Sequence, residues 1–296
     1  MTDTNNLLRQ RLLSDSSLRR ICGFTTVPSE ATFSRRLTEF AQKCLPEAVL
    51  AKLVRQYHEG ILVRVIARDS TTIAGREKSH NKKKSVKIKK HKRGRPRKDE
   101  VREPKEMKRV ERQLRQSPGR SLSELDKDCG WGCKTNSQGK TQYTKGFKLH
   151  LDVSDQGIPI SACVTGANVH DSQVAIPLEK MTERRVTHLY SMADSAYDFP
   201  EHRMYISGKG RAGVIDPNNR RSSVKRELST LEREQFKART VVERANSHLK
   251  DHFLPSTLYV KGHCKVSFVV MMGVLCLAAL KIIQADWISP AIAAQF

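Results

Sequence analysis

The sequence has few cysteines, few aromatic residues and no apolar stretch at its start. Seven cysteines lie at irregular spacing over 296 residues. This density is too low for a disulfide scaffold, so we expect a reducing, cytoplasmic setting. Aromatic residues make up only 6% of the chain, which disfavours a protein that binds single strands by stacking bases on aromatic rings. Residues 1–6 are polar, so we expect no secretory signal.

Long apolar segments are equally scarce. The one long run extends from Val266 to Leu280, with two interruptions, and lysines 265 and 281 flank it. Its 15 residues fall short of the roughly 20 that a membrane-spanning helix needs. The run therefore predicts a buried core helix, and we expect no membrane partner.

Acidic residues are outnumbered, and the excess of positive charge is local. The chain has 54 Lys and Arg against 31 Asp and Glu, a formal net charge of +23, which predicts a polyanionic partner, nucleic acid above all. The segment from Arg76 to Lys98 alone holds 13 basic residues and one acid, Glu77. About half of the excess thus comes from one short run.

Within this run, Arg93, Arg95 and Arg97 surround a glycine and a proline in the order Arg-Gly-Arg-Pro-Arg. Glycine and proline keep such a strip extended, so that its arginines can enter a narrow A·T-rich minor groove, as in an AT-hook. The alternative is a disordered polybasic loop that binds phosphates without sequence preference.

Apolar periodicity and turn residues predict an α/β chain with a mixed sheet. The first predicted strand, 61–69, ends on Asp69, and a later one, 187–194, ends on Asp194. Ser229 and Glu232 form a predicted capping box at the start of a long helix. The other predicted elements are a hairpin over 147–165, a helix from 171 or 172 to about 181, a short strand over 213–216 and the long helix over 230–252.

Residues 1–58 are predicted to be helical. Ser29 is a predicted N-cap, and Arg35 and Arg36 lie on the exposed side of the helix that follows. Two short helices with basic residues on the second are typical of a DNA-binding helix-turn-helix. A plain helical bundle explains the same pattern equally well.

Three acids stand out by their positions: Asp69, Asp194 and Glu243. At 100° per residue, Glu243 shares one narrow helix stripe with Arg239 and Lys250. An Arg–Glu pair four residues apart also forms for helix stability alone, but this does not explain the two strand-end aspartates. Three carboxylates in a basic protein suggest Mg²⁺ or Mn²⁺, with Arg239 and Lys250 holding phosphates.

These residues resemble a known family. Arg239, Glu243 and Lys250, with Phe236 in place of tyrosine, match the spacing of the Tyr-Arg-Glu-Lys signature found in a group of DDE transposases of bacterial insertion sequences. The contexts Ala-Arg-Asp-Ser-Thr around Asp69 and Met-Ala-Asp-Ser-Ala-Tyr-Asp around Asp194 are similar to those of the same family, and so are Lys-Gly-Phe-Lys-Leu-His at 145–150 and Thr-Gly-Ala-Asn-Val-His-Asp-Ser at 165–172.

The resemblance implies a ribonuclease-H-like fold with Asp69 on the first strand, Asp194 on the fourth and Glu243 on a late helix. We therefore expect a helical N-terminal domain over 1–58, a DDE catalytic domain over 59–285 interrupted by a basic insertion over 75–142, and a tail over 286–296. The three acids would be the catalytic metal ligands.

The resemblance also implies an activity, partners and a location. It implies cleavage of double-stranded DNA at terminal inverted repeats and attack of the freed 3′-hydroxyl on target DNA. A homodimer or larger synaptic complex at the bacterial nucleoid would carry this out. Two alternatives stay open: a non-enzymatic DNA-binding protein derived from a decayed transposase, and a nuclease without strand transfer.

Overall fold

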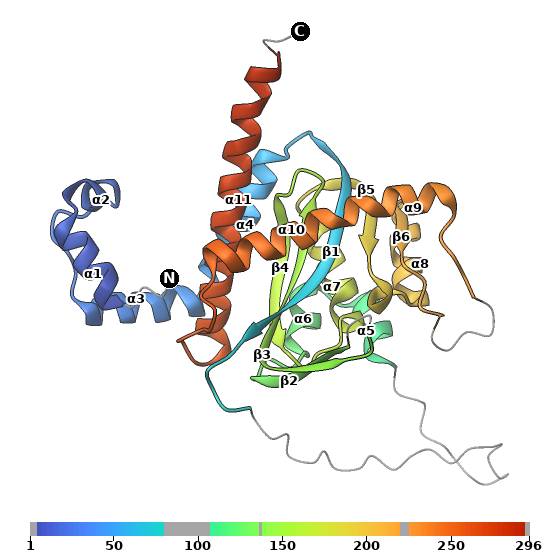
Figure 1. The fold of residues 1–296 in the computed structure, drawn as a ribbon, viewed down its shortest axis with the longest axis horizontal. Coiled ribbons are helices and arrows are strands. Elements are labelled where there is room, and N and C mark those ends of the chain that lie inside the picture. Colours follow the sequence, from blue (N-terminus) through green and yellow to red (C-terminus); the bar gives the residue numbers. More distant parts are fainter. Residues whose placement is uncertain (1–4, 80–106, 136–137, 220–224, 294–296) are drawn as a thin grey trace.

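A computed structural model describes residues 5–79, 107–135, 138–219 and 225–293, with the stretch from 286 described by its backbone only (Figure 1). Arg93, Arg95 and Arg97 lie outside the described residues, so the two interpretations of the basic run remain predictions.

A mixed sheet lies at the centre of the molecule. In the part that the structure describes, its strands are β1 (Leu62–Ala74), β2 (Gly130–Thr135), β3 (Thr141–Ser154), β4 (Pro159–Gly166), β5 (Thr187–Ala193) and β6 (Ala212–Ile215). They follow the order β2-β3-β1-β5-β6, and β4 also pairs with β3. The pairs of β5 with β1 and with β6 are parallel and the others antiparallel. The predicted α/β fold is confirmed and is consistent with a ribonuclease-H-like domain.

Helices flank both faces of the sheet (Figure 1). The largest apolar core joins the sheet to α4 (Leu45–Tyr57), α10 (Thr240–His248) and α11 (His263–Ala293). On the other face, α7 (Ser172–Glu183) packs on β3 and β4. Three further helices contact α7: α5 (Arg109–Arg115), α6 (Pro118–Ser123) and α8 (Pro200–Gly208).

The predicted long late helix is confirmed as one continuous helical run of four segments. These are α9 (Thr230–Phe236), the 3₁₀ turn η3 (Lys237–Arg239), α10 and the π-helical turn η4 (Leu249–Phe253). The capping box forms as predicted. The Ser229 hydroxyl accepts from the Glu232 backbone N–H at 3.3 Å, and the Ser229 N–H donates to the Glu232 carboxylate at 2.8 Å.

The apolar run from 266 to 280 lies in α11, which is long and apolar enough to cross a membrane by length and composition. In the structure it packs on β4, α4 and α3, and it supplies seven residues to the largest core: Val266, Val270, Met271, Val274, Leu277, Ala278 and Ile282. This packing agrees with the predicted core helix.

The N-terminal residues are helical, as predicted. They form α1 (Asn5–Ser14), α2 (Ser16–Ile21) and α3 (Glu30–Gln42) ahead of α4. Ser29 caps α3, and its hydroxyl accepts from the Thr32 N–H. Phe24 and Phe33 meet edge-to-face across the turn between α2 and α3. Unlike α1–α3, α4 contributes Leu50 and Val54 to the largest core.

Three sequence expectations need correction. β1 does not end at Asp69 but continues to Ala74, because residues 71–73 (Thr-Thr-Ile) pair with β3. The predicted insertion over 75–142 is not wholly outside the sheet, because it contains β2, and this extra strand makes Asp194 follow the fifth strand and not the fourth. The predicted tail begins within a helix, since the backbone of α11 continues to Ala293.

Candidate active site

Asp69 and Asp194 lie at the same level of neighbouring parallel strands. In the register of β1 and β5, Ala67 lies opposite Met192, and each aspartate comes two residues later. Neighbouring strands run about 4.8 Å apart, so the fold brings both carboxylates to one place. Asp194 directly follows β5 and begins the 3₁₀ turn η1 (residues 195–197), where its Oδ1 accepts from the Ala196 N–H at 3.1 Å.

Arg239 connects the strand acid to the helix acid. Its Nη1 lies 3.7 Å from Oδ1 of Asp69, and its Nη2 lies 2.6 Å from Oε1 of Glu243. The guanidinium also lies over the Phe236 ring, 5.6 Å from the ring centre. The aromatic side chain at this position therefore supports Arg239 by stacking, which requires no hydroxyl group.

A neighbouring residue on the same helix also contacts the strand acid. Asn246 Nδ2 donates to Oδ2 of Asp69 at 3.2 Å, and the side-chain oxygen Oδ1 of Asn246 is buried without a partner among the described residues. Lys250 follows in η4. Burial, and next the charge of Lys134, lower the pKa of Lys250, while Asp69 opposes this shift.

Burial makes both aspartates reluctant to ionise. It raises the pKa of Asp69 from 3.8 to about 6. Arg239 partly offsets this effect and Asp194 adds to it. The pKa of Asp194 is raised as well, by burial and then by the charge of Asp171. Two neighbouring acids with raised pKa values are typical of functional sites, because a bound cation offsets the cost of ionising them.

Two site residues escaped the sequence analysis. The sequence predicts a helix that begins at 171 or 172, but Asp171 makes no capping hydrogen bond, and its carboxylate accepts from Lys148 Nζ at 3.0 Å. Burial alone would raise the pKa of Asp171, but His150, Lys148 and Ser70 lower it below its usual value. The second residue is Lys134 on β2, whose charge acts on both strand aspartates. No pattern pointed to it, because β2 itself was not predicted.

The donor set fits a hard divalent cation in part. Asp69 and Asp194 supply paired carboxylates whose raised pKa values a dication would lower. Glu243, by contrast, is held by Arg239, and its side chain is 52% exposed. Among the described residues, no three His, Cys, Asp or Glu side chains gather as a metal-binding group. Arg239 here supplies the positive charge between Asp69 and Glu243.

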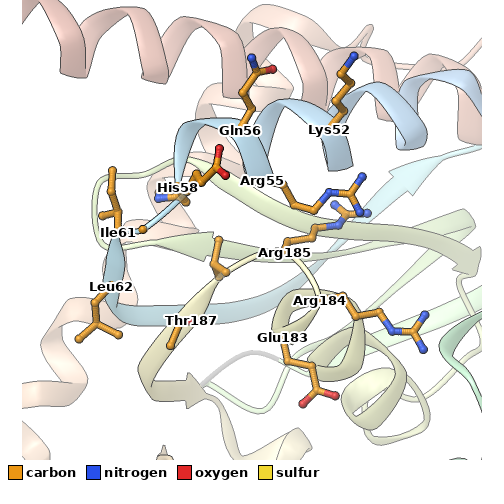
Figure 2. Close-up of a pocket in the computed structure, with 13 residues that line it drawn as sticks. Lys52, Arg55, Gln56, His58, Ile61, Leu62, Glu183, Arg184, Arg185 and Thr187 are labelled. Carbon is orange, nitrogen blue, oxygen red and sulfur yellow. The ribbon is translucent and has the colours of Figure 1, made fainter.

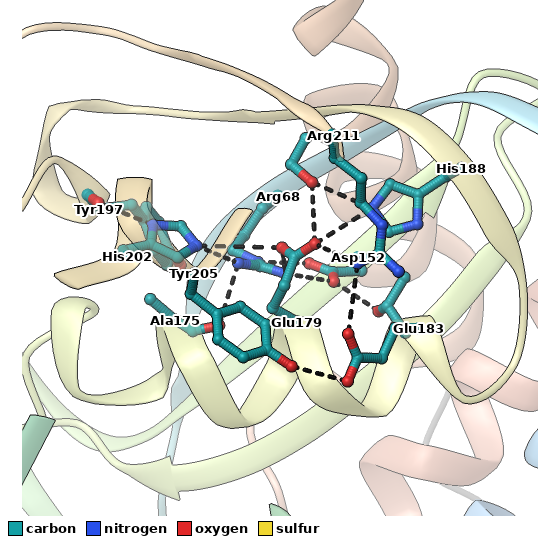
Figure 3. A network of polar contacts seen from close by, with 12 residues as sticks. Arg68, Asp152, Ala175, Glu179, Glu183, His188, Tyr197, His202, Tyr205 and Arg211 are labelled. Carbon is teal, nitrogen blue, oxygen red and sulfur yellow. Dashed lines mark hydrogen bonds and ion pairs between the residues drawn. The ribbon is translucent and has the colours of Figure 1, made fainter. Parts of the chain in front are cut away.

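The residue before Asp69 belongs to a buried polar network on the opposite face of the sheet (Figure 3). Arg68 donates to both carboxylate oxygens of Asp152, at 2.7 and 2.6 Å, and to Glu179 at 2.9 Å. Its Nη1 also lies 3.1 Å from His202 Nε2, while His202 Nδ1 lies 3.0 Å from the carbonyl oxygen of Tyr197. Tyr197 ends η1, which begins at Asp194, so this network connects the backbones that carry both aspartates.

The remaining predicted site residues lie on α3. Arg36 pairs with Glu39 at 2.6 Å and Arg35 donates to Thr32 Oγ1 at 3.4 Å. These contacts are local, and the structure brings neither arginine into the group around Asp69. Their assignment to DNA binding remains a prediction.

Comparison with known proteins identifies the domain. Residues 63–279 match the family described as "Transposase DDE domain", a stretch that contains Asp69, Asp194 and Glu243 and covers well over half of the chain. Comparisons with curated proteins and with solved structures give no match. The chain therefore belongs to the transposase DDE domain family, whose members cleave and transfer DNA in transposition.

Proposed function

We propose that this chain is the transposase of an insertion sequence. It would cleave double-stranded DNA at the terminal inverted repeats of the element and join the freed 3′-hydroxyl to target DNA. A dimer or larger synaptic complex would bring the two element ends together. The observation that supports this best is the bridge from Asp69 through Arg239 to Glu243, with Asp194 beside Asp69 on the next strand.

In this proposal, Asp69 and Asp194 hold a divalent metal together with Glu243, once Glu243 leaves Arg239. Bound Mg²⁺ or Mn²⁺ would polarise the phosphodiester and lower the pKa of the attacking water or hydroxyl. Arg239 is well placed to contact phosphate oxygens after it releases the acids, because a guanidinium binds them in a bidentate manner. Lys250 would provide a second cation, and burial lowers its pKa.

The Glu243→Gln variant tests the assignment of the third ligand. Metal assistance contributes several kcal/mol to such reactions, and about 1.4 kcal/mol is a tenfold change in rate. We therefore expect Mg²⁺-dependent nicking to fall by roughly 100-fold or more. The matched control is Glu234→Gln, on the same helical run, where the glutamate is 64% exposed and pairs with Lys237 alone among the residues that the structure describes. Undiminished nicking by Glu243→Gln would remove Glu243 from the site.

A strand-transfer assay, run beside the nicking assay, separates the proposal from its two alternatives. A labelled donor with a free 3′-hydroxyl is incubated with plasmid target, and joined product is resolved by size. Joined product supports the transposase, and nicking without joining supports a nuclease. Binding without Mg²⁺-dependent nicking by the unchanged chain supports a non-enzymatic DNA-binding protein.

A further inference from the structure

A cavity lies away from the candidate active site. It has a volume of about 850 Å³ and opens between the end of α4, the start of β1 and the turn from α7 to β5. The residues around it include Lys52, Arg55, Arg184 and Arg185 (Figure 2). Asp69, Asp194, Arg239, Glu243 and Lys250 do not line this cavity.

The cavity concentrates positive charge that has little compensation. Lys52, Arg55 and Arg184 are exposed and make no ion pair with any residue that the structure describes. Figure 2 shows the guanidinium groups of Arg55 and Arg185 close together. Burial, and next the charge of Arg55, lower the pKa of Arg185 to about 10. Such repulsion between like charges is relieved when an anion binds between them.

The other ionisable groups around the cavity do not cancel this charge. Glu183 accepts from the Tyr205 hydroxyl of α8 at 2.7 Å and lies 3.5 Å from Arg211, so its carboxylate already has partners outside the cavity. Glu59 is the second acid of the lining. Burial lowers the pKa of His58, which is therefore neutral at pH 7 and adds no charge. Four cations of the lining thus face two lining acids, one of them already paired, and the charges of Asp152 and Glu47 outside the lining partly offset that of Arg185.

The cavity lies at the opposite end of the strands from the aspartates. Leu62 and Thr187 line it and begin β1 and β5. Asp69 and Asp194 come seven residues later in each case, which corresponds to about 23 Å at 3.3 Å per residue. The phosphates bound at the aspartates therefore cannot also occupy the cavity, and only a more distant part of the same DNA backbone can reach it.

We propose that this cavity binds backbone phosphates of double-stranded DNA outside the segment held at the candidate active site. The inference rests on the proposed function, because that function supplies the DNA. Three arginines favour phosphate as the ligand, since the guanidinium fork matches its oxygens. The cations come from two separate elements, α4 and the end of α7, so an extended polyanion contacts more of them than a single free phosphate does.

The test measures DNA affinity against salt. A fluorescently labelled 40-base-pair duplex is titrated with the full chain and with the double variant Arg55→Gln, Arg184→Gln over a range of KCl concentrations. Each lost phosphate contact reduces the slope of log K against log salt by about 0.9, so we expect the slope to fall by about 1.8. The matched control is Arg115→Gln, Arg120→Gln, which removes two exposed arginines from α5 and α6 and should leave the slope nearly unchanged.

Two results would overturn the inference. One is an unchanged slope in the cavity variant; if millimolar inorganic phosphate then raises the melting temperature of the full chain but not that of the cavity variant, the cavity binds a small anion only. The other is an equal loss of slope in the control variant. If the double variant does not melt cooperatively, Lys52→Gln replaces it, with an expected slope loss of about 0.9.

Mg²⁺-dependent nicking is measured in parallel on the same samples. Nicking by the full chain with an unchanged slope in the cavity variant rejects the cavity and leaves the proposed function intact. A reduced slope without any nicking by the full chain rejects the proposed function and retains the DNA contact.

Discussion

At the scale of single residues, Asp69 is a costly side chain. Its side chain is four-fifths buried, and it lies beside Asp194 with Arg239 as a partial counterion. Burial raises its pKa to about 6, so the folded chain holds this proton more tightly than the unfolded chain. The ionised form therefore weakens folding, as is common where a site is arranged for a ligand and not for stability.

The Asp69→Asn variant should be more stable than the unchanged chain at pH 8. The penalty from Asp69 is fully present above its folded pKa of about 6 and is lost as the pH falls towards the unfolded value near 4. We expect a difference on the order of 1–3 kcal/mol at pH 8, shrinking to nearly zero at pH 4. Urea unfolding curves at several pH values measure this difference.

Asp128→Asn is the control for this prediction, because Asp128 is exposed. Its stability difference from the unchanged chain should stay small at every pH. Added Mg²⁺ gives an independent readout, since a ligand at ten times its dissociation constant stabilises by about 1.4 kcal/mol. We expect that gain for the unchanged chain and not for Asp69→Asn. If Asp69→Asn is less stable than the unchanged chain at pH 8, ionised Asp69 does not lower the free energy of unfolding.

The sequence predicted those site residues whose contacts follow from local spacing, and missed those that meet only in the folded chain. Arg239 and Glu243 share a helix stripe, and their contact follows from helical spacing alone. Asp171 followed no such rule. Its carboxylate contacts Lys148 and raises the pKa of Asp194 only because the fold brings β3, the start of α7 and the end of β5 together. Side chains that depend on tertiary contacts leave no trace in spacing.

At the scale of elements, β1 carries opposite chemistry on its two faces. Asp69 faces α10, whereas Arg68 faces α7 and α8 and is almost fully buried. Burial alone would raise the pKa of Glu179, but Arg68 and two histidines hold it well below its usual range. The strand is thus fixed on one side by a charge network, and this leaves its other side free to present the aspartate.

The Arg68→Met variant should lose about 3–5 kcal/mol of unfolding free energy, the usual cost of leaving buried charges without their partner. Asp152 and Glu179 would be the uncompensated charges. Guanidinium unfolding measures the loss. Arg64→Met is the matched control on the same strand, because Arg64 is exposed and should change stability by less than about 0.5 kcal/mol. Similar losses in both variants would show that the network around Arg68 makes no special contribution to the free energy of unfolding.

Predicted and observed elements differ for reasons that packing explains. The capping box and the alternating hairpin strands were visible because local residues determine them. β2 was not visible, because its sequence begins Gly-Trp-Gly-Cys, with two residues of low strand propensity. Glycine is required there by a close approach of backbones: a Cβ on Gly132 would lie 2.7 Å from the carbonyl oxygen of Ala167. Only the folded chain contains that contact.

At the scale of the whole molecule, the N-terminal residues divide in two. None of the described residues of α1–α3 belongs to the largest core, whereas Leu50 and Val54 of α4 are fully buried within it. The Ser267 hydroxyl of α11 also donates to Glu47 of α4 at 3.1 Å. These contacts pack α4 into the same core as the strands of the DDE domain, whereas the sequence predicts α4 within the N-terminal domain over 1–58, and that boundary stays a prediction.

Two shortened chains separate these roles. The chain 44–296 lacks α1–α3 and should still unfold in one cooperative thermal transition, because the largest core is complete. The chain 59–296 also lacks α4 and loses two fully buried aliphatic side chains, each worth about 2–5 kcal/mol. This loss is comparable with the 5–15 kcal/mol that typically holds a domain together. We therefore expect 59–296 to lack a cooperative transition in calorimetry, and equal melting of the two chains would place the domain boundary near residue 58.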